Sequence, residues 1–261
     1  MAGMETSFLF IGLVFVLAGL VKGVTGMGLP TVAVALLTLR MPPLEAAALL
    51  IVPSSVTNVW QLAVGPALYP LLQRFRWLLA GVCAGTALAG AALAWLSGGD
   101  AGAGTGAGTG RVAGAVLGLA LVGYGLLGLT GWRMRVAARH QRWAGPLAGA
   151  ATGAMSAVTG VFVMPVAPYL QALDLDKDDL VQALGLAFTV ATLALAVMLV
   201  CRGEWQASAA SGSFLALLPA CGGMMLGQWL RDRMRPALFR RCFFVGLVAL
   251  GAHQLLRIVT G

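Results

Sequence analysis

The chain has 261 residues, of which 59% are hydrophobic and 10% are charged, and its mean hydropathy is +0.90. A soluble domain cannot bury so large an apolar fraction, so the composition predicts a polytopic membrane protein in a lipid bilayer. The net charge of +8 comes mainly from loops between apolar runs. The positive-inside rule accounts for such cations, and nucleic acid is not an expected partner.

In chain order, the apolar runs predict six ordinary membrane helices and two interrupted ones. A hydrocarbon core of about 30 Å takes about 20 helical residues. Six runs have that length, at 44–64, 77–96, 112–130, 180–200, 211–230 and 242–259. Two longer runs, at 8–39 and 145–173, are interrupted in the middle by Gly and Pro. We therefore expect an all-α fold with 8 to 10 helical segments, given that each break separates two helices.

The two interruptions resemble one another. The first contains GLVKGVTGMGLP at 19–30 and the second contains GAMSAVTGVFVMP at 153–165. A shift of 134 positions (159 minus 25) superposes the shared Val-Thr-Gly and sets one acidic residue opposite another, pairing Thr25 with Thr159 and Glu45 with Asp179. Such matches indicate a duplicated transporter core. We predict repeats at 1–131 and 145–261, joined by a basic cytoplasmic connector at 132–144.

The distribution of Lys and Arg predicts the topology. If each interrupted run forms a re-entrant hairpin of two half-helices, the cations gather on one side, as the positive-inside rule requires. That side then holds Arg74, Arg76, Arg133, Arg135, Arg139, Arg142, Lys177, Arg231, Arg233, Arg235, Arg240 and Arg241, and the other holds Arg40, Arg111, Arg202 and Arg257. Three full crossings and one hairpin in each half make the repeats inverted.

The chain carries two glycine-containing motifs, eight or so apolar segments and a basic central loop. In these features it resembles the sulfite exporter TauE/SafE family of membrane permeases. The first motif carries most of the resemblance. The second departs from the family pattern, with Val161, Phe162 and Val163 where glycines often occur. The resemblance implies transport of small sulfur-containing anions, such as sulfite or organosulfonates, across the inner (cytoplasmic) membrane.

The breaks are the first candidate site. Non-helical backbone at membrane depth is tolerated only where protein buries it or a watery cavity hydrates it. Half-helices that start there would present free N–H groups and positive dipole ends to an anion. The expected substrate-binding residues are Thr25, Gly26, Gly28, Pro30, Ser156, Thr159, Gly160 and Pro165. The alternative is that Gly and Pro merely kink two helices.

Polar residues near the breaks extend this candidate site. A cation deep in a membrane span costs about 2.5–3.5 kcal/mol, which predicts that Lys22 lies on the anion path unless it extends to a surface. At 100° per residue, one helix face carries Ser54, Thr57, Asn58 and Gln61, and another carries Gln182 and Thr189. Hydrogen bonding between helices without a ligand is the alternative explanation.

The acidic residues predict how transport is driven. All nine lie in predicted loops or helix ends, so we expect potential-driven efflux of a monoanion without a coupling ion. Glu45 and Asp179 are expected to complement helix dipoles, and coupling is their alternative role. A passive channel and a proton- or cation-coupled importer stay open as alternatives. An enzyme, a cofactor and a metal site are not expected, and the oligomeric state is left open.

Overall fold

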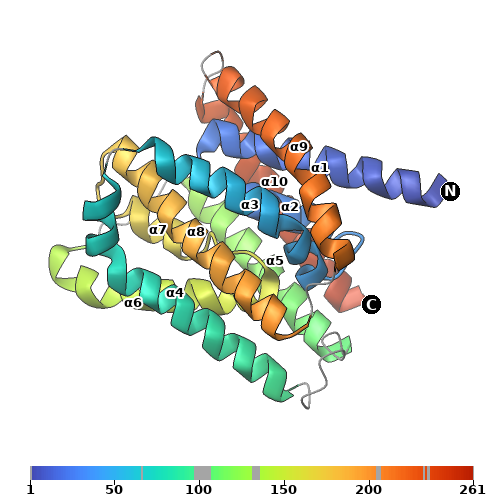
Figure 1. The fold of residues 1–261 in the computed structure, drawn as a ribbon, viewed down its shortest axis with the longest axis horizontal. Coiled ribbons are helices and arrows are strands. Elements are labelled where there is room, and N and C mark those ends of the chain that lie inside the picture. Colours follow the sequence, from blue (N-terminus) through green and yellow to red (C-terminus); the bar gives the residue numbers. More distant parts are fainter. Residues whose placement is uncertain are drawn as a thin grey trace.

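The computed structural model describes residues 2–65, 67–96, 107–130, 136–203, 207–231, 233 and 236–260 (Figure 1). These residues form ten helices and no strand, which confirms the all-α expectation. The helices are α1 (Ala2–Thr25), α2 (Leu29–Leu37), α3 (Pro43–Val64), α4 (Leu68–Leu96), α5 (Ala107–Thr130), α6 (Ala138–Thr159), α7 (Val166–Gln171), α8 (Lys177–Cys201), α9 (Ala207–Arg231) and α10 (Pro236–Thr260).

Six described helices are long and apolar enough to cross a membrane, namely α3, α4, α5, α8, α9 and α10. They confirm the six predicted ordinary spans. In α1 the apolar part is shorter, covering Leu9–Thr25. Because α6 begins at Ala138, the predicted connector at 132–144 overlaps its first turns, and residues 131–135 lie outside the described part.

Both predicted breaks are confirmed in position. In the first, α1 ends at Thr25 and α2 begins at Leu29; in the second, α6 ends at Thr159 and α7 begins at Val166. Gly28 has a φ of 103° and Gly160 a φ of 74°. Side chains other than hydrogen are strained in this left-handed region, so glycine allows the chain to leave the helix there.

Two parallel helix pairs pack with their backbones in contact. In the pair α1·α9, a Cβ on Gly19 would lie 2.1 Å from the carbonyl oxygen of Ala220. In the pair α4·α6, a Cβ on Gly153 would lie 2.1 Å from the carbonyl oxygen of Val82. Small residues at four-residue spacing allow this close approach in membranes. We call the contact of α1 with α9 and that of α4 with α6 the two glycine seams.

Two antiparallel pairs complete the bundle, α3 beside α8 and α5 beside α10 (Figure 1). If each helix of the first five is exchanged with the one five places later in the chain, so that α3 takes the place of α8 and α5 that of α10, each of these two pairs is unchanged. The same exchange maps α1·α9 onto α6·α4 and α3·α9 onto α8·α4. Equivalent helices that run in opposite directions support the inverted-repeat hypothesis, which stays a prediction.

Charged residues mark the two ends of the bundle. Arg74 of α4 and Arg142 of α6 line one pocket, so the starts of these helices lie at the same end. Arg202, which follows α8, donates to the carbonyl oxygen of Gly90 near the far end of α4, at 3.2 Å. These positions agree with the predicted division of cations; which end faces the cytoplasm stays a prediction.

Candidate functional site

Lys22 lies inside the bundle, one helical turn before the first break. Its carbonyl oxygen accepts from the N–H of Gly26 at 2.8 Å, and the residue is only 3% exposed. The ammonium donates to Thr57 Oγ1 at 3.0 Å and to Asn58 Oδ1. Within the described ranges no carboxylate pairs with it. Lys22 is therefore a buried side chain whose charged form would need a counter-ion, and the described residues supply none; it does not extend to a surface.

Asn58 connects this cation to the second half of the chain. Its Nδ2 donates to Thr192 Oγ1 of α8 at 3.3 Å, and both residues are buried. We call Lys22, Thr57, Asn58 and Thr192 the central polar cluster. Thr192 was missed in the sequence, although it lies 134 positions after Asn58 (192 minus 58), the same offset that relates the two breaks.

Unpaired oxygen atoms accompany the cluster. Among the described residues, four buried side-chain oxygens have no hydrogen-bond partner, on Thr31, Ser54, Gln61 and Ser156. Ser54 lies one turn before Asn58 on α3, and Thr31 lies in the first turn of α2. Ser156 is 134 positions after Lys22 (156 minus 22), so it holds the corresponding place in the second half. Buried polar atoms are normally paired, and such exceptions are expected where a ligand supplies the missing partner.

The two threonines of the breaks, Thr25 and Thr159, form hydrogen bonds with nearby backbone groups. Thr25 Oγ1 lies within hydrogen-bond distance of the carbonyl oxygens of Val21 and Met27, at 2.8 and 2.6 Å, and Thr159 Oγ1 donates to that of Met155 at 2.7 Å. The backbone N–H two residues further on donates back to each hydroxyl, at 3.3 and 3.2 Å. Both hydroxyls therefore fix the exit from a helix in this conformation. Both threonines share the bond to the carbonyl four residues before and the bond from the N–H two residues after, which supports the duplication.

The two polar residues predicted on α8 have structural partners. Gln182 Nε2 donates to the carbonyl oxygens of Leu62 and Gly65, at 2.9 and 2.7 Å. Gln182 Oε1 accepts from the N–H of Ala67 at 2.8 Å, so this side chain ties α8 to the turn between α3 and α4. Thr189 donates to a carbonyl of its own helix at 2.7 Å. For both residues the alternative of hydrogen bonding without a ligand fits better.

The two short helices differ as anion sites. At the start of α2 no side chain caps the helix, and Thr31 has a free hydroxyl beside Pro30. At the start of α7 the N–H of Val166 donates to Thr152 Oγ1 at 3.0 Å. The expectation of a free N–H there is wrong for Val166. Since α7 after Pro165 has only six residues, its dipole is also short, and the first break is the better site.

Glu45 and Asp179 lie where dipole partners belong, in the first turns of α3 and α8. Each stands 13 residues before the cluster residue of its helix, Asn58 or Thr192. At 1.5 Å per residue this places each carboxylate about 20 Å away along the axis. Neither can touch the central polar cluster in this conformation, and among the described residues no group of three metal-binding side chains occurs.

Comparison with known proteins gives one finding. A family profile described as sulfite exporter TauE/SafE matches residues 11–253, which includes both breaks and the whole central polar cluster. Neither the comparison with curated proteins nor that with solved structures gives a match.

Proposed function

The chain belongs to the sulfite exporter TauE/SafE family of membrane transporters, and on this premise we propose that it exports small sulfur-containing anions such as sulfite or organosulfonates. The proposed location is the inner (cytoplasmic) membrane, with the arginine-rich end of the bundle toward the cytoplasm.

One observation carries the proposal: the amino group of Lys22 is buried, and no carboxylate among the described residues pairs with it. Burial of an unpaired ion costs several kcal/mol, and a bound anion would offset that cost. An ammonium has three donors, of which Thr57 and Asn58 take two. The third donor is left for a ligand, together with the unpaired hydroxyls of Ser54 and Thr31. Such a donor set suits an oxyanion.

A carrier fits the cluster better than an open pore does. Lys22 is 3% exposed, Asn58 0% and Thr192 1%, so the site is closed to both ends of the bundle. An anion can reach it only after a rearrangement that opens one side. Since Asn58 and Thr192 join the two halves, relative movement of those halves is the expected rearrangement, as in other transporters built from inverted repeats.

Outward movement of a monoanion follows from the placement of the charges. Glu45 and Asp179 lie at helix ends far from the cluster, so no carboxylate there is placed to carry a coupling proton. An inside-negative potential contributes about 2.3 kcal/mol per charge per 100 mV, in the direction of efflux for an anion. Import would need a coupled cation, for which these two residues are the candidates.

Flux into proteoliposomes tests the proposal. The panel is labelled sulfite, thiosulfate, sulfoacetate, taurine and chloride, each measured with and without unlabelled substrate on the opposite side. We expect saturable sulfite or sulfonate flux that is stimulated by counterflow. Flux without saturation or counterflow would instead identify a channel.

Two variants assign the site. Two opposite charges 4 Å apart at an effective dielectric constant of 20 interact by about 4 kcal/mol, so Lys22→Met is expected to lower the apparent affinity at least about a hundredfold. Arg111→Gln is the control, because Arg111 is exposed at the start of α5. Unchanged affinity in Lys22→Met would remove this lysine from the anion path.

A further inference from the structure

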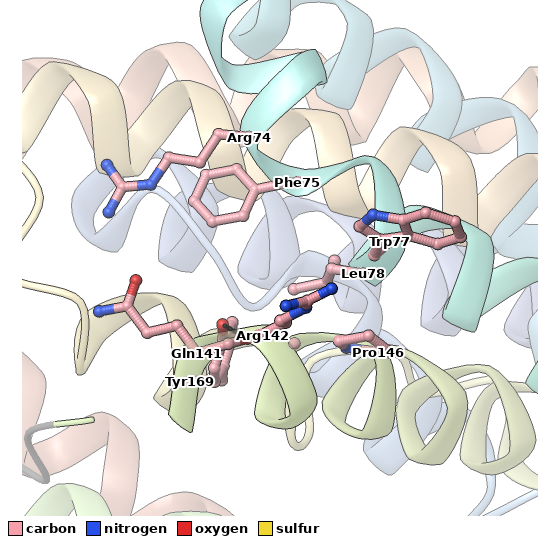
Figure 2. A pocket seen from close by; sticks show the side chains of 9 residues that line it. Arg74, Phe75, Trp77, Leu78, Gln141, Arg142, Pro146 and Tyr169 are labelled. Carbon is pink, nitrogen blue, oxygen red and sulfur yellow. Dashed lines mark hydrogen bonds between the residues drawn. The ribbon is translucent and has the colours of Figure 1, made fainter. Parts of the chain in front are cut away.

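A second cationic feature lies apart from the central polar cluster. A pocket of about 150 Å³ opens between the first turns of α4 and α6. Figure 2 shows the side chains of α4 on one side of the opening and those of α6 with Tyr169 on the other. The lining residues are Arg74, Phe75, Trp77, Leu78, Gln141, Arg142, Gly145, Pro146 and Tyr169. None of them belongs to the predicted transport site.

The pocket calls for an anionic ligand. Arg74 and Arg142 contribute two guanidinium groups, and no lining residue is acidic. The flanking stretches 68–80 and 136–150 contain two further arginines, Arg76 and Arg139, and neither stretch has an Asp or Glu. The hydroxyl of Tyr169 donates to the carbonyl oxygen of Gln141 at 3.3 Å, and this bond holds two lining residues together. Guanidinium groups bind phosphate oxygens with two donors at once.

The pocket lies near the starts of two helices, where a headgroup layer would be expected. Arg74 is six residues after the start of α4 and Arg142 is four after the start of α6. At 1.5 Å per residue these are about 9 and 6 Å from the helix ends. With 29 residues, α4 extends about 43 Å, well beyond a hydrocarbon core of about 30 Å. A helix of this length can place its first turns in the polar layer, and the arginines there favour that end over the apolar far end.

The rim of the pocket suits a lipid better than a dissolved ion. Trp77 is 62% exposed, and Trp143 and Leu147 on α6 are 74% and 68% exposed. Exposed tryptophans are enriched at the level where headgroups meet acyl chains. An acyl chain attached to a headgroup phosphate could lie along this apolar rim, whereas a free oxyanion would make no use of it.

We propose that the pocket formed by Arg74, Arg142 and Tyr169 binds the phosphate of an anionic phospholipid headgroup. Basic pockets between membrane helices are known to take such headgroups. This ligand would also join the halves of the chain, because Arg74 lies on α4 of the first half and Arg142 on α6 of the second. The proposal is independent of the transported substrate.

Native mass spectrometry of the full-length protein tests this site. Purified protein is titrated with phosphatidylglycerol, cardiolipin or phosphatidylcholine, and retained lipid is counted. The test variant is Arg74→Gln with Arg142→Gln. The matched control, Arg76→Gln with Arg139→Gln, removes the same charge from exposed residues that do not line the pocket. The test pair removes two guanidinium groups that would make charge-assisted hydrogen bonds to the phosphate, so retention should weaken at least about thirtyfold. The control pair removes charges that do not line the pocket and should weaken retention only slightly.

Further measurements make the result decisive. The thermal transition in phosphatidylcholine should be the same for both double variants, which shows that the test pair folds. If it does not fold, Arg74→Lys with Arg142→Lys replaces it, and we expect several-fold weaker retention because lysine loses the two-donor geometry. An equal loss of lipid retention in the test and control pairs would overturn the assignment of the pocket as the lipid site. Displacement of the lipid by millimolar inorganic phosphate or sulfite would overturn the lipid assignment in favour of a free oxyanion.

Discussion

Two neighbouring glycines of α9 allow a matched test of the glycine seams. A Cβ built on Gly222 meets nothing within 4 Å, whereas one built on Gly223 would lie 2.2 Å from the carbonyl oxygen of Val16 and 3.0 Å from its Cα. The atoms on the other side are backbone, which cannot rotate away. Gly223→Ala must therefore push α1 and α9 apart, and Gly222→Ala need not move anything.

The expected difference follows from this geometry. Each substitution gains up to about 1 kcal/mol of helix propensity, a figure measured in water. Gly223→Ala must also move two packed helices by about 1 Å, and overpacking of this kind typically costs about 1–3 kcal/mol. The free energies of unfolding of the two variants should therefore differ by about 1–3 kcal/mol, with Gly223→Ala the less stable.

Thermal unfolding in detergent measures this difference, and flux measures its functional effect. Lys22 lies next to Gly23, a seam residue of α1 whose built Cβ would come within 2.2 Å of the carbonyl oxygen of Met224. A displaced α1 would move Lys22 away from Asn58, so Gly223→Ala should lose transport while Gly222→Ala keeps it. Equal unfolding temperatures and equal flux in the two variants would refute close backbone packing at this seam.

Three further predictions concern the ends of the bundle and the driving force. Gln182→Leu removes three hydrogen bonds to part-buried backbone groups at the end of α3 and the turn after it; at about 0.5–1.5 kcal/mol for each lost hydrogen bond, the free energy of unfolding should fall by about 1.5–4.5 kcal/mol, and a chemical denaturation curve unchanged from wild type would contradict it. In a cysteine-free background, thiols at Arg139 and Arg233 should react with impermeant reagents from the same face, and labelling from opposite faces would disprove the hairpin topology. Anion efflux from proteoliposomes should follow a valinomycin-set potential, whereas flux that ignores voltage and follows a proton or sodium gradient would make Glu45 and Asp179 couplers.

Sequence alone located the breaks because glycine and proline act locally. A φ of 103° at Gly28 is unfavourable for any other residue, so the interruption is visible without knowledge of the neighbours. The six long spans were equally accessible, since length and hydropathy decide them. The burial cost of Lys22 singled out this residue before its partners were known.

The partners themselves depend on the packing of distant helices. A helical wheel places Asn58 on a polar face but cannot say that Thr192 of α8 lies opposite. The wheel also placed Gln182 among the expected substrate-binding residues, although its amide hydrogen-bonds to the backbone of a neighbouring turn. The start of α6 was assigned to a connector because Arg139 and Arg142 interrupt its apolar pattern. A hydropathy average depends only on composition, so it detects the apolar part of a helix. It does not detect a polar first turn of the same helix that extends beyond the hydrocarbon core.

The glycine seams also determine what can fold alone. Each seam joins the opening helix of one half to the fourth helix of the other, α1 to α9 and α6 to α4. A half expressed alone would leave these glycine faces without the backbone that fills them. We therefore expect that neither predicted repeat folds independently, because each needs the glycine face of the other for its packing. Fragments separated at the connector are expected to recover a native bundle only when both are made in the same membrane.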